Sequence, residues 1–222
     1  MKAVLADLSA AGMRAEKAKI PLRVVAAASG IGTVLKNTML TIPPYGSRIV
    51  LQGLMLDVDD VLESSPFSVL CSQSCCQSCK ACERACPSGA IDGEGYHHAS
   101  CLRSHTGGGN MPEWVMERLP GLLGCERCQD VCPANARLAR RELTNEEREA
   151  FPLDKLLAGK LDGPLALVGK NQKNRLLPQA IVLAGRSGNP AYLPTLQQLT
   201  DSEDGAVRRA AEWALKRLTA DI

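Results

Sequence analysis

Apolar residues recur at helical spacing near both ends of the chain. Residues 2–11 place them three and four positions apart, and Gly12 stands where a C-terminal cap belongs, which predicts a short amphipathic helix. Residues 48–57 are rich in β-branched and apolar side chains, which predicts a strand. From Leu156 onward the pattern is helical, and it predicts helices over 174–185, 190–199 and 205–218.

The joints between these last three helices are short, as in the helix pairs of a HEAT-type solenoid. Gly188, Asn189 and Pro190 form one joint, and residues 201–204 form the other. Pro178 is expected in the first turn of its helix, where a missing N–H costs little. Because one such unit cannot bury its own apolar face, we expect the tail to pack on the domain before it.

Gly30 and Gly32 break an apolar stretch shortly before Lys36, which invites comparison with phosphate-binding loops. The spacing does not fit, because Lys36 does not follow a glycine and Leu35 stands where the dinucleotide fingerprint has its third glycine. We therefore expect a tight turn here rather than a nucleotide site.

Two cysteine motifs set the character of the middle of the chain. Residues 76–87 read C-x2-C-x2-C-x3-C-P, the run of bacterial two-cluster ferredoxins, and residues 125–133 repeat it with one cysteine missing. Cys101, between the motifs, supplies the missing thiolate and brings the total to eight. Eight thiolates are the ligands of two [4Fe-4S] clusters.

Each motif ends in Cys-Pro, and proline both stops a helix and favours an extended conformation in the residue before it. The chain is expected to turn away there, so that the fourth cysteine of each run ligates the other cluster. The first cluster is assigned to Cys76, Cys79, Cys82 and Cys132. The second cluster is assigned to Cys86, Cys101, Cys125 and Cys128.

Disulfides and zinc are the competing uses of these cysteines. A disulfide framework requires an oxidising compartment, and residues 1–20 lack the uninterrupted apolar core of a signal peptide. Zinc sites usually come as two C-x2-C pairs separated by a loop, whereas both motifs here end in Cys-Pro. Cys71 and Cys75 are left over and are interpreted as spare thiols, with no role assigned.

Three histidines, His97, His98 and His105, surround Cys101 in a polar, glycine-rich stretch. Histidine replaces cysteine at one iron of Rieske centres. With eight cysteines available this replacement is not needed, and we interpret the three as loop histidines.

Composition and charge limit the remaining classes. Aromatic residues make up only 3% of the chain, so its cores must be built from Leu, Val and Ala, which favours helices over sheets. The net charge of +2 is lower than that of a dedicated nucleic-acid binder, so any basic patch must be local. No apolar run reaches the roughly 18 residues of a membrane span. We expect a soluble, cytoplasmic protein without membrane contact.

The C-terminal third is locally basic. Its basic residues are Lys170, Lys173, Arg175, Arg186, Arg208, Arg209, Lys216 and Arg217. Helical spacing turns Arg209, Lys216 and Arg217 toward related faces, while Trp213 and Leu218 are candidates for the core. An RNA-facing patch and scattered surface charge both remain open.

These residues together resemble the epoxyqueuosine reductase family. The shared pieces are Ser29-Gly30-Ile31-Gly32 with Lys36-Asn37, Tyr45-Gly46-Ser47-Arg48, the eight cysteines, Gly124-Cys125, Gln129 to Pro133, and Ala214 to Arg217. The resemblance implies an α+β protein in three parts. These are a partial α/β segment over 1–66, a ferredoxin-like double-cluster domain over 67–140 and a helical HEAT-like region over 141–222.

Members of that family reduce an epoxide on a modified guanosine of tRNA, using a corrinoid that receives electrons from two clusters, while the tail helps to hold the tRNA. The resemblance therefore implies a redox role, a low-potential electron donor and tRNA contact. The family begins with a larger α/β region, so residues 1–66 are expected to form a wall of a corrinoid pocket rather than an enclosure. Glu16 lies near the family's catalytic aspartate, but the local match does not carry that role over.

Two functions of different class follow. In the first, the chain is an epoxyqueuosine-reductase-like oxidoreductase, either a shortened member of the family or one whose cobalamin site is completed by another polypeptide. In the second, it is a two-cluster ferredoxin-type electron carrier with a docking tail. Reductive dehalogenation is a third, fainter alternative, because it also combines a corrinoid with two clusters. No catalytic or corrinoid-binding residue is assigned.

Overall fold

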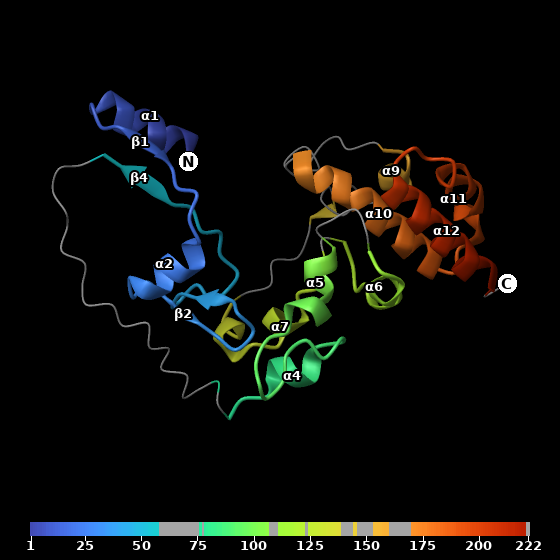
Figure 1. Cartoon of the computed structure of the whole chain (residues 1–222), viewed down its shortest axis with the longest axis horizontal. Helices are drawn as coiled ribbons and strands as arrows, with labels where there is room; N and C mark the ends of the chain where they lie inside the picture. The colour runs from blue at the N-terminus through green and yellow to red at the C-terminus, as the bar shows by residue number, and fades with distance from the viewer. Residues whose placement is uncertain are drawn as a thin grey trace. The chain divides into compact units, whose positions relative to one another are not determined.

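The computed structural model describes residues 1–57, 76, 78–106, 111–122, 124–138, 144–145, 153–159 and 170–220, and side chains in the last range from 175 onward. The chain divides into two compact units (Figure 1). Unit 1 comprises Met1–Cys86, Ile91–Tyr96 and Arg127–Ala139, and unit 2 comprises Pro87–Ala90, His97–Glu126 and Arg140–Ile222. All the boundaries between the units fall within the predicted cluster domain, and the division into three parts stays a prediction.

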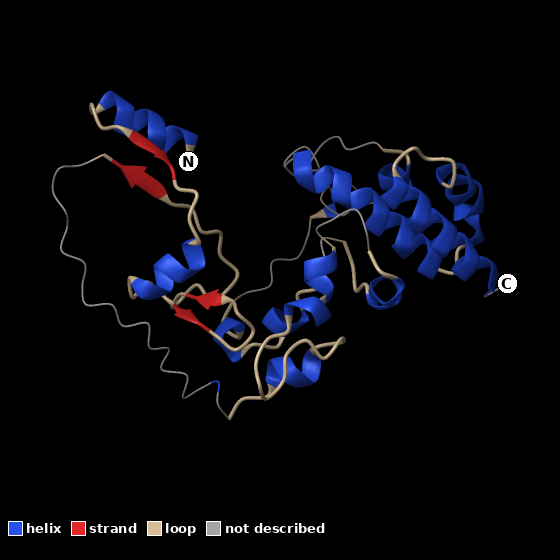
Figure 2. Ribbon diagram, viewed as in Figure 1, coloured by secondary structure: helices blue, strands red, loops and turns tan. Residues whose placement is uncertain are grey.

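Unit 1 combines short helices with two small antiparallel sheets (Figure 2). Its helices are α1 (Lys2–Ala10), α2 (Leu22–Ala28), α4 (Ala81–Ala85), α7 (Arg127–Asp130) and the 3-10 helix η2 (Pro133–Asn135). Its strands are β1 (Ala15–Lys17) with β4 (Leu54–Leu56), and β2 (Thr33–Val34) with β3 (Leu40–Thr41). The helices α4 and α7, which carry parts of the two cysteine motifs, lie in contact.

The amino-terminal helix is confirmed, and it ends just before Gly12, whose φ of 77° is the left-handed conformation that glycine adopts without strain. The strand predicted over 48–57 is too long. Only Leu54–Leu56 pair with β1, and one further backbone bond flanks the pairing at each end, from Ala18 N–H to the Gly53 oxygen and from Asp57 N–H to the Arg14 oxygen. The turn predicted at Gly30 is present, and Gly30 also has a positive φ of 71°.

Unit 2 is helical in its described part. Its elements are η1 (His98–Ser100), α5 (Leu102–His105), α6 (Glu113–Arg118), α9 (Leu153–Leu157), α10 (Lys170–Arg186), η4 (Pro190–Tyr192), α11 (Leu193–Leu199) and α12 (Gly205–Ala220). The three tail helices are confirmed (Figure 2). None of the helices in the described ranges has both the length and the apolar composition that crossing a membrane requires.

The position predicted for Pro178 is wrong. The helix α10 starts at Lys170, so Pro178 lies in its interior, more than two turns from its first residue. The start was misplaced because residues 170–173 are all polar and continue no apolar stripe. Proline has no N–H to give to the carbonyl four residues back, which leaves one backbone bond of α10 unmade.

The core of unit 2 is built from aliphatic side chains, as the low aromatic content predicts. Leu176, Ile181, Leu196 and Leu218 are fully buried, and alanines of α10 and α12 fill the space between them. Trp213 is only partly buried and packs against the edge of this core. The HEAT-like character of the tail stays a prediction.

Small residues allow α10 and α12 to approach closely. A Cβ placed on Gly185 would lie 2.6 Å from both Cα and Cβ of Ala214, and real Cβ atoms do not come this near to a backbone atom. The absence of a side chain at Gly185 therefore sets the separation of the two helices.

We expect Gly185→Val to lower the free energy of unfolding. Overpacking against the Ala214 backbone costs about 1–3 kcal/mol, while the gain in helix propensity is only about 0.3 kcal/mol. Thermal unfolding followed by the helical circular dichroism signal measures the change. Gly121→Val is the matched control, because a Cβ there meets nothing within 4 Å. Equal stability of the two variants would show that α10 and α12 separate without cost.

Candidate metal centre

Four of the eight predicted ligands line one cavity of unit 1. Cys76 and Cys79 precede α4, Cys82 lies within α4, and Cys132 lies between α7 and η2. The cavity has a volume of about 190 Å³. These are the four cysteines that the spacing argument assigns to the first cluster, and their role as ligands stays a prediction.

The backbone at the two Cys-Pro steps has the predicted extended form. Cys86 has φ −72° and ψ 113°, and Cys132 has φ −71° and ψ 124°. Both helical segments that carry the motifs end just before these cysteines. The chain therefore leaves each motif at its proline, as the sequence predicts.

No disulfide joins any two of the eight cysteines that the structure describes. Burial raises the pKa of the Cys82 thiol, so the neutral form is favoured in the absence of a compensating cation. Metal binding requires the thiolate, and a metal centre would supply that compensation.

The described residues contain no group of three or more His, Cys, Asp or Glu placed to hold a single metal ion. A cubane differs from a single ion, because each of its four thiolates binds a different iron and the sulfur atoms need not converge on one point. The donor set of the cavity is all sulfur, which is the set that iron–sulfur clusters use.

The four cysteines assigned to the second cluster are divided between the units. Cys86 and Cys128 belong to unit 1, whereas Cys101 and Cys125 belong to unit 2. Cys71 and Cys75 lie outside the described residues. The assignment of the second ligand set therefore stays a prediction.

A hairpin of β2 and β3 forms the wall of the cavity that contains no cysteine. Thr33, Leu35, Lys36, Asn37 and Thr41 line it. The same hairpin includes Lys36 and Asn37, whose spacing from the preceding glycines does not fit a nucleotide-binding loop. Beyond the turn predicted at Gly30, the hairpin closes one side of the candidate metal centre.

Two side chains of the hairpin bind the cysteine motifs. Lys36 Nζ lies 2.5 Å from Oε1 of Glu83, the residue directly after Cys82. This hydrogen bond raises the pKa of Lys36. The buried Asn37 donates through Nδ2 to the backbone oxygen of Cys128 at 3.3 Å. The hairpin is thus attached to both motifs.

The segment Tyr45–Arg48 is attached to the second motif by a separate network. Asn135 Oδ1 accepts from the backbone N–H of Ser47 at 2.8 Å, and its Nδ2 donates to the backbone oxygen of Gln129 at 2.8 Å. Arg48 pairs with Asp130 at 2.5 Å. Gly46 has no room for a side chain, because a Cβ there would lie 2.3 Å from Asn135 Oδ1.

The histidines are not all in loops, which corrects the sequence interpretation. His98 lies in η1 and His105 in α5. His105 Nε2 lies 2.7 Å from the backbone oxygen of Ala99, and its ring meets Trp114 edge to face at 5.2 Å. These contacts are those of a structural side chain. None of the three lines the cysteine cavity.

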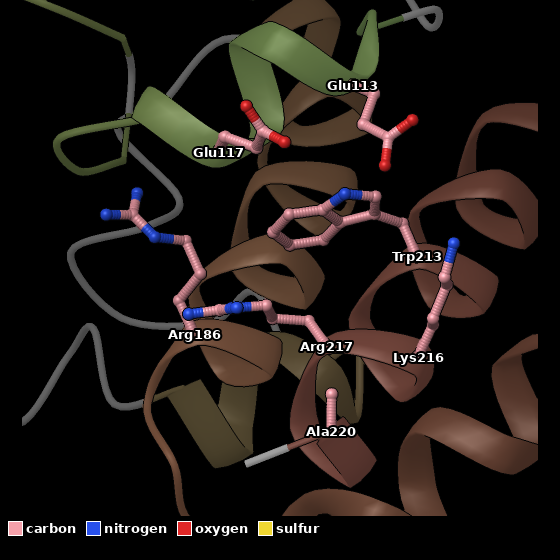
Figure 3. A pocket seen from close by; sticks show the side chains of 7 residues that line it. All are labelled: Glu113, Glu117, Arg186, Trp213, Lys216, Arg217 and Ala220. Atoms are coloured by element: carbon pink, nitrogen blue, oxygen red, sulfur yellow. The ribbon is translucent and has the colours of Figure 1, made fainter.

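Unit 2 has a charged cleft of its own, with a volume of about 550 Å³ (Figure 3). Trp213 of α12 lies between carboxylates on one side and cations on the other. The carboxylates are Glu113 and Glu117 of α6, and the cations are Arg186 of α10 with Lys216 and Arg217 of α12. Arg186 also donates to the backbone oxygen of Leu119.

The cleft collects only part of the predicted basic patch. Of the basic residues named from the sequence, Arg186, Lys216 and Arg217 line the cleft, whereas Arg208 donates to the backbone oxygen of Ser202 at 2.8 Å. Arg175 and Arg209 are exposed. The sequence did not place Arg186 beside Lys216 and Arg217, because Arg186 lies on α10 and the other two lie on α12.

Comparison with known proteins agrees with the cysteine pattern. Residues 75–135 match the family described as the 4Fe-4S double cluster binding domain. Epoxyqueuosine reductase of Bacillus subtilis is 35% identical over 215 residues, which cover 88% of this chain and 53% of that protein. The enzyme of Lactococcus garvieae is 32% identical over 212 residues, with 87% and 57% covered.

Solved structures show the same fold. The epoxyqueuosine reductase of Streptococcus thermophilus superposes with a TM-score of 0.74 over 99% of this chain and 62% of its own, at 23% identity. That of Bacillus subtilis gives 0.65 over 97% and 70%, also at 23% identity. The chain spans about half the length of the curated relatives it matches. Over nearly all of its own length the chain is similar to the epoxyqueuosine reductases, and its residues 75–135 match a 4Fe-4S double cluster binding domain.

Proposed function

We propose that this chain is an iron–sulfur oxidoreductase whose two [4Fe-4S] clusters pass electrons in a reaction like that of the epoxyqueuosine reductases. The observation that carries the proposal is the cavity lined by Cys76, Cys79, Cys82 and Cys132. These cysteines come from two motifs, and the pairing of three from one motif with one from the other is the arrangement of two-cluster ferredoxins.

The residues around this cavity fit a cluster. The four thiols supply the ligands, and a cluster held by them would transfer single electrons. Leu35 of the hairpin is buried and gives the cavity an apolar side chain beside the thiols. Asn37 fixes the hairpin by its bond to the Cys128 carbonyl, so that this wall keeps its place.

The substrate proposal rests on the relatives, which are epoxyqueuosine reductases. Removal of an epoxide oxygen as water takes two electrons and two protons, so single-electron clusters need a further cofactor such as a corrinoid. The strands of the described segment 1–57 are two or three residues long, whereas a corrinoid needs a deep and largely preformed pocket. We assign no residue to a corrinoid, and a two-cluster electron carrier is the alternative.

We expect the anaerobically purified chain to contain about eight iron and eight sulfide, the content of two cubanes. Colorimetric iron and acid-labile sulfide analysis measures this content. Reduction by dithionite should bleach the visible absorption, and reoxidation by an added one-electron acceptor should restore it. Protein that carries zinc in place of iron, or only half of the iron, would contradict the proposal.

The ligand pairing is tested by three serine variants, one of which serves as the reference for the first cluster. Cys132→Ser is expected to change the paramagnetic resonance signal of the first cluster, whereas Cys101→Ser should change that of the second. Cys79→Ser provides the assignment, because Cys79 shares the cavity with Cys132. If Cys132→Ser resembles Cys101→Ser rather than Cys79→Ser, the pairing is wrong.

We also propose that unit 2 contacts RNA, and the charged cleft supports this. Arg186, Lys216 and Arg217 offer three cations to phosphate, and the partly exposed indole of Trp213 offers a surface on which a base can stack. Glu113 and Glu117 lie on the opposite wall and repel phosphate from it, which would restrict the backbone to the cationic side.

Charge reversal measures this contact. We expect Arg175→Glu, Arg208→Glu, Arg209→Glu and Lys216→Glu each to weaken tRNA binding, with Lys216→Glu strongest because it lines the cleft. Fluorescence anisotropy with labelled tRNA should also show a lower salt dependence in the Lys216 variant, since one phosphate contact is lost. Lys2→Glu on α1 is the control with the same charge change. Unaltered tRNA affinity in all four variants would rule out the RNA contact.

A further inference from the structure

The ion pair between Lys36 and Glu83 stands at the wall of the cysteine cavity. It joins a hairpin residue to the first cysteine motif across 47 positions of sequence, and the two side chains are only 21% and 15% exposed. Among the described residues that line the cavity, Lys36 is the only one with a cationic side chain. Glu83 directly follows Cys82 but does not line the cavity itself.

The charge of Lys36 is placed where it acts on the cavity. Asn37, the next residue, is held by the Cys128 carbonyl, and Arg23 Nη1 donates to the backbone oxygen of Thr38 at 2.8 Å. These bonds fix the hairpin turn, and the bond to Glu83 fixes the ammonium group. A charge held in one position in a partly buried site acts through a lower effective dielectric than a charge in bulk water.

Reduction of a cluster adds one electron to a centre that already carries four thiolate charges. A cation nearby stabilises the reduced form and raises the reduction potential, whereas an anion lowers it. Lys36 and Glu83 therefore act in opposite directions. Because Lys36 lines the cavity and Glu83 does not, the cation has the larger effect on the reduction potential.

We propose that the Lys36–Glu83 ion pair sets the reduction potential of the cluster held by Cys76, Cys79, Cys82 and Cys132. Lys36 raises this potential, and Glu83 limits the rise by partly neutralising the ammonium group. The inference rests on the proposed function, since it requires that the four cysteines hold a cluster. It assigns to the pair a positioning and tuning role, distinct from that of the ligands.

A redox titration of the purified, cluster-loaded chain tests the proposal. The readout is the paramagnetic resonance signal of the first cluster, identified as the signal that Cys132→Ser alters. Lys36→Met is expected to lower the equilibrium constant for reduction about tenfold, which for a one-electron couple is about 59 mV. Glu83→Gln should raise it several-fold, because it leaves the ammonium charge unopposed. The double variant should lie between the two single variants.

Two controls separate charge from packing. Lys36→Arg keeps the cation and should keep the potential close to that of the unaltered chain. Lys80→Met removes an exposed lysine directly after Cys79, and the potential should move far less than in Lys36→Met. Glu83→Gln preserves the shape and hydrogen-bonding groups of the side chain, so it carries the test even where Lys36→Met loses iron.

The outcomes are distinct. If both single variants shift the potential in the same direction, or if neither shifts it while the iron content stays complete, the proposed role of the ion pair is wrong. If the unaltered chain binds no iron–sulfur cluster, the proposed function itself fails before the variants are compared. Opposite shifts, with recovery in Lys36→Arg, would support the role of the pair.

Discussion

The amide of Asn135 joins two parts of unit 1 that lie 88 residues apart in sequence. Asn135 is buried, so its bonds to Ser47 and Gln129 form away from water and would be costly to break. Through them the amino-terminal segment is held against the second cysteine motif. Together with the bonds that Lys36 and Asn37 make to the two motifs, this attachment keeps the hairpin over the cysteines as a wall of the cavity.

The hairpin in turn gives the cavity two different faces. One face is formed by sulfur donors from the two motifs, and the other by a mixture of apolar side chains, one amide and one ammonium group. Motifs that are far apart in sequence therefore belong to one structural unit. This explains why Lys36-Asn37, Tyr45–Arg48 and the cysteine run occur together in one chain.

The sequence predicted best where many residues repeat one signal. The apolar stripes of α10, α11 and α12 are long enough to show the helical period, and the cysteine spacing is specific enough to group four residues that the structure places in one cavity. It failed where the signal is short. The strands β2 and β3 have two residues each, too few for an alternating pattern. Lys36 was compared with nucleotide loops because of the glycines before it, and its partner Glu83, 47 residues away, gave no local signal. Asn135 gave no local signal at all.

The span of these contacts also bears on how the protein is assembled during synthesis. Cys76, Cys79 and Cys82 leave the ribosome some fifty residues before Cys132, and at ordinary translation rates of about 5–20 residues per second that interval lasts several seconds. Over that time Asn37 of the hairpin lacks its partner Cys128, and Ser47 lacks its partner Asn135. The cavity of the candidate metal centre therefore takes its final form only after the second cysteine motif has been synthesised.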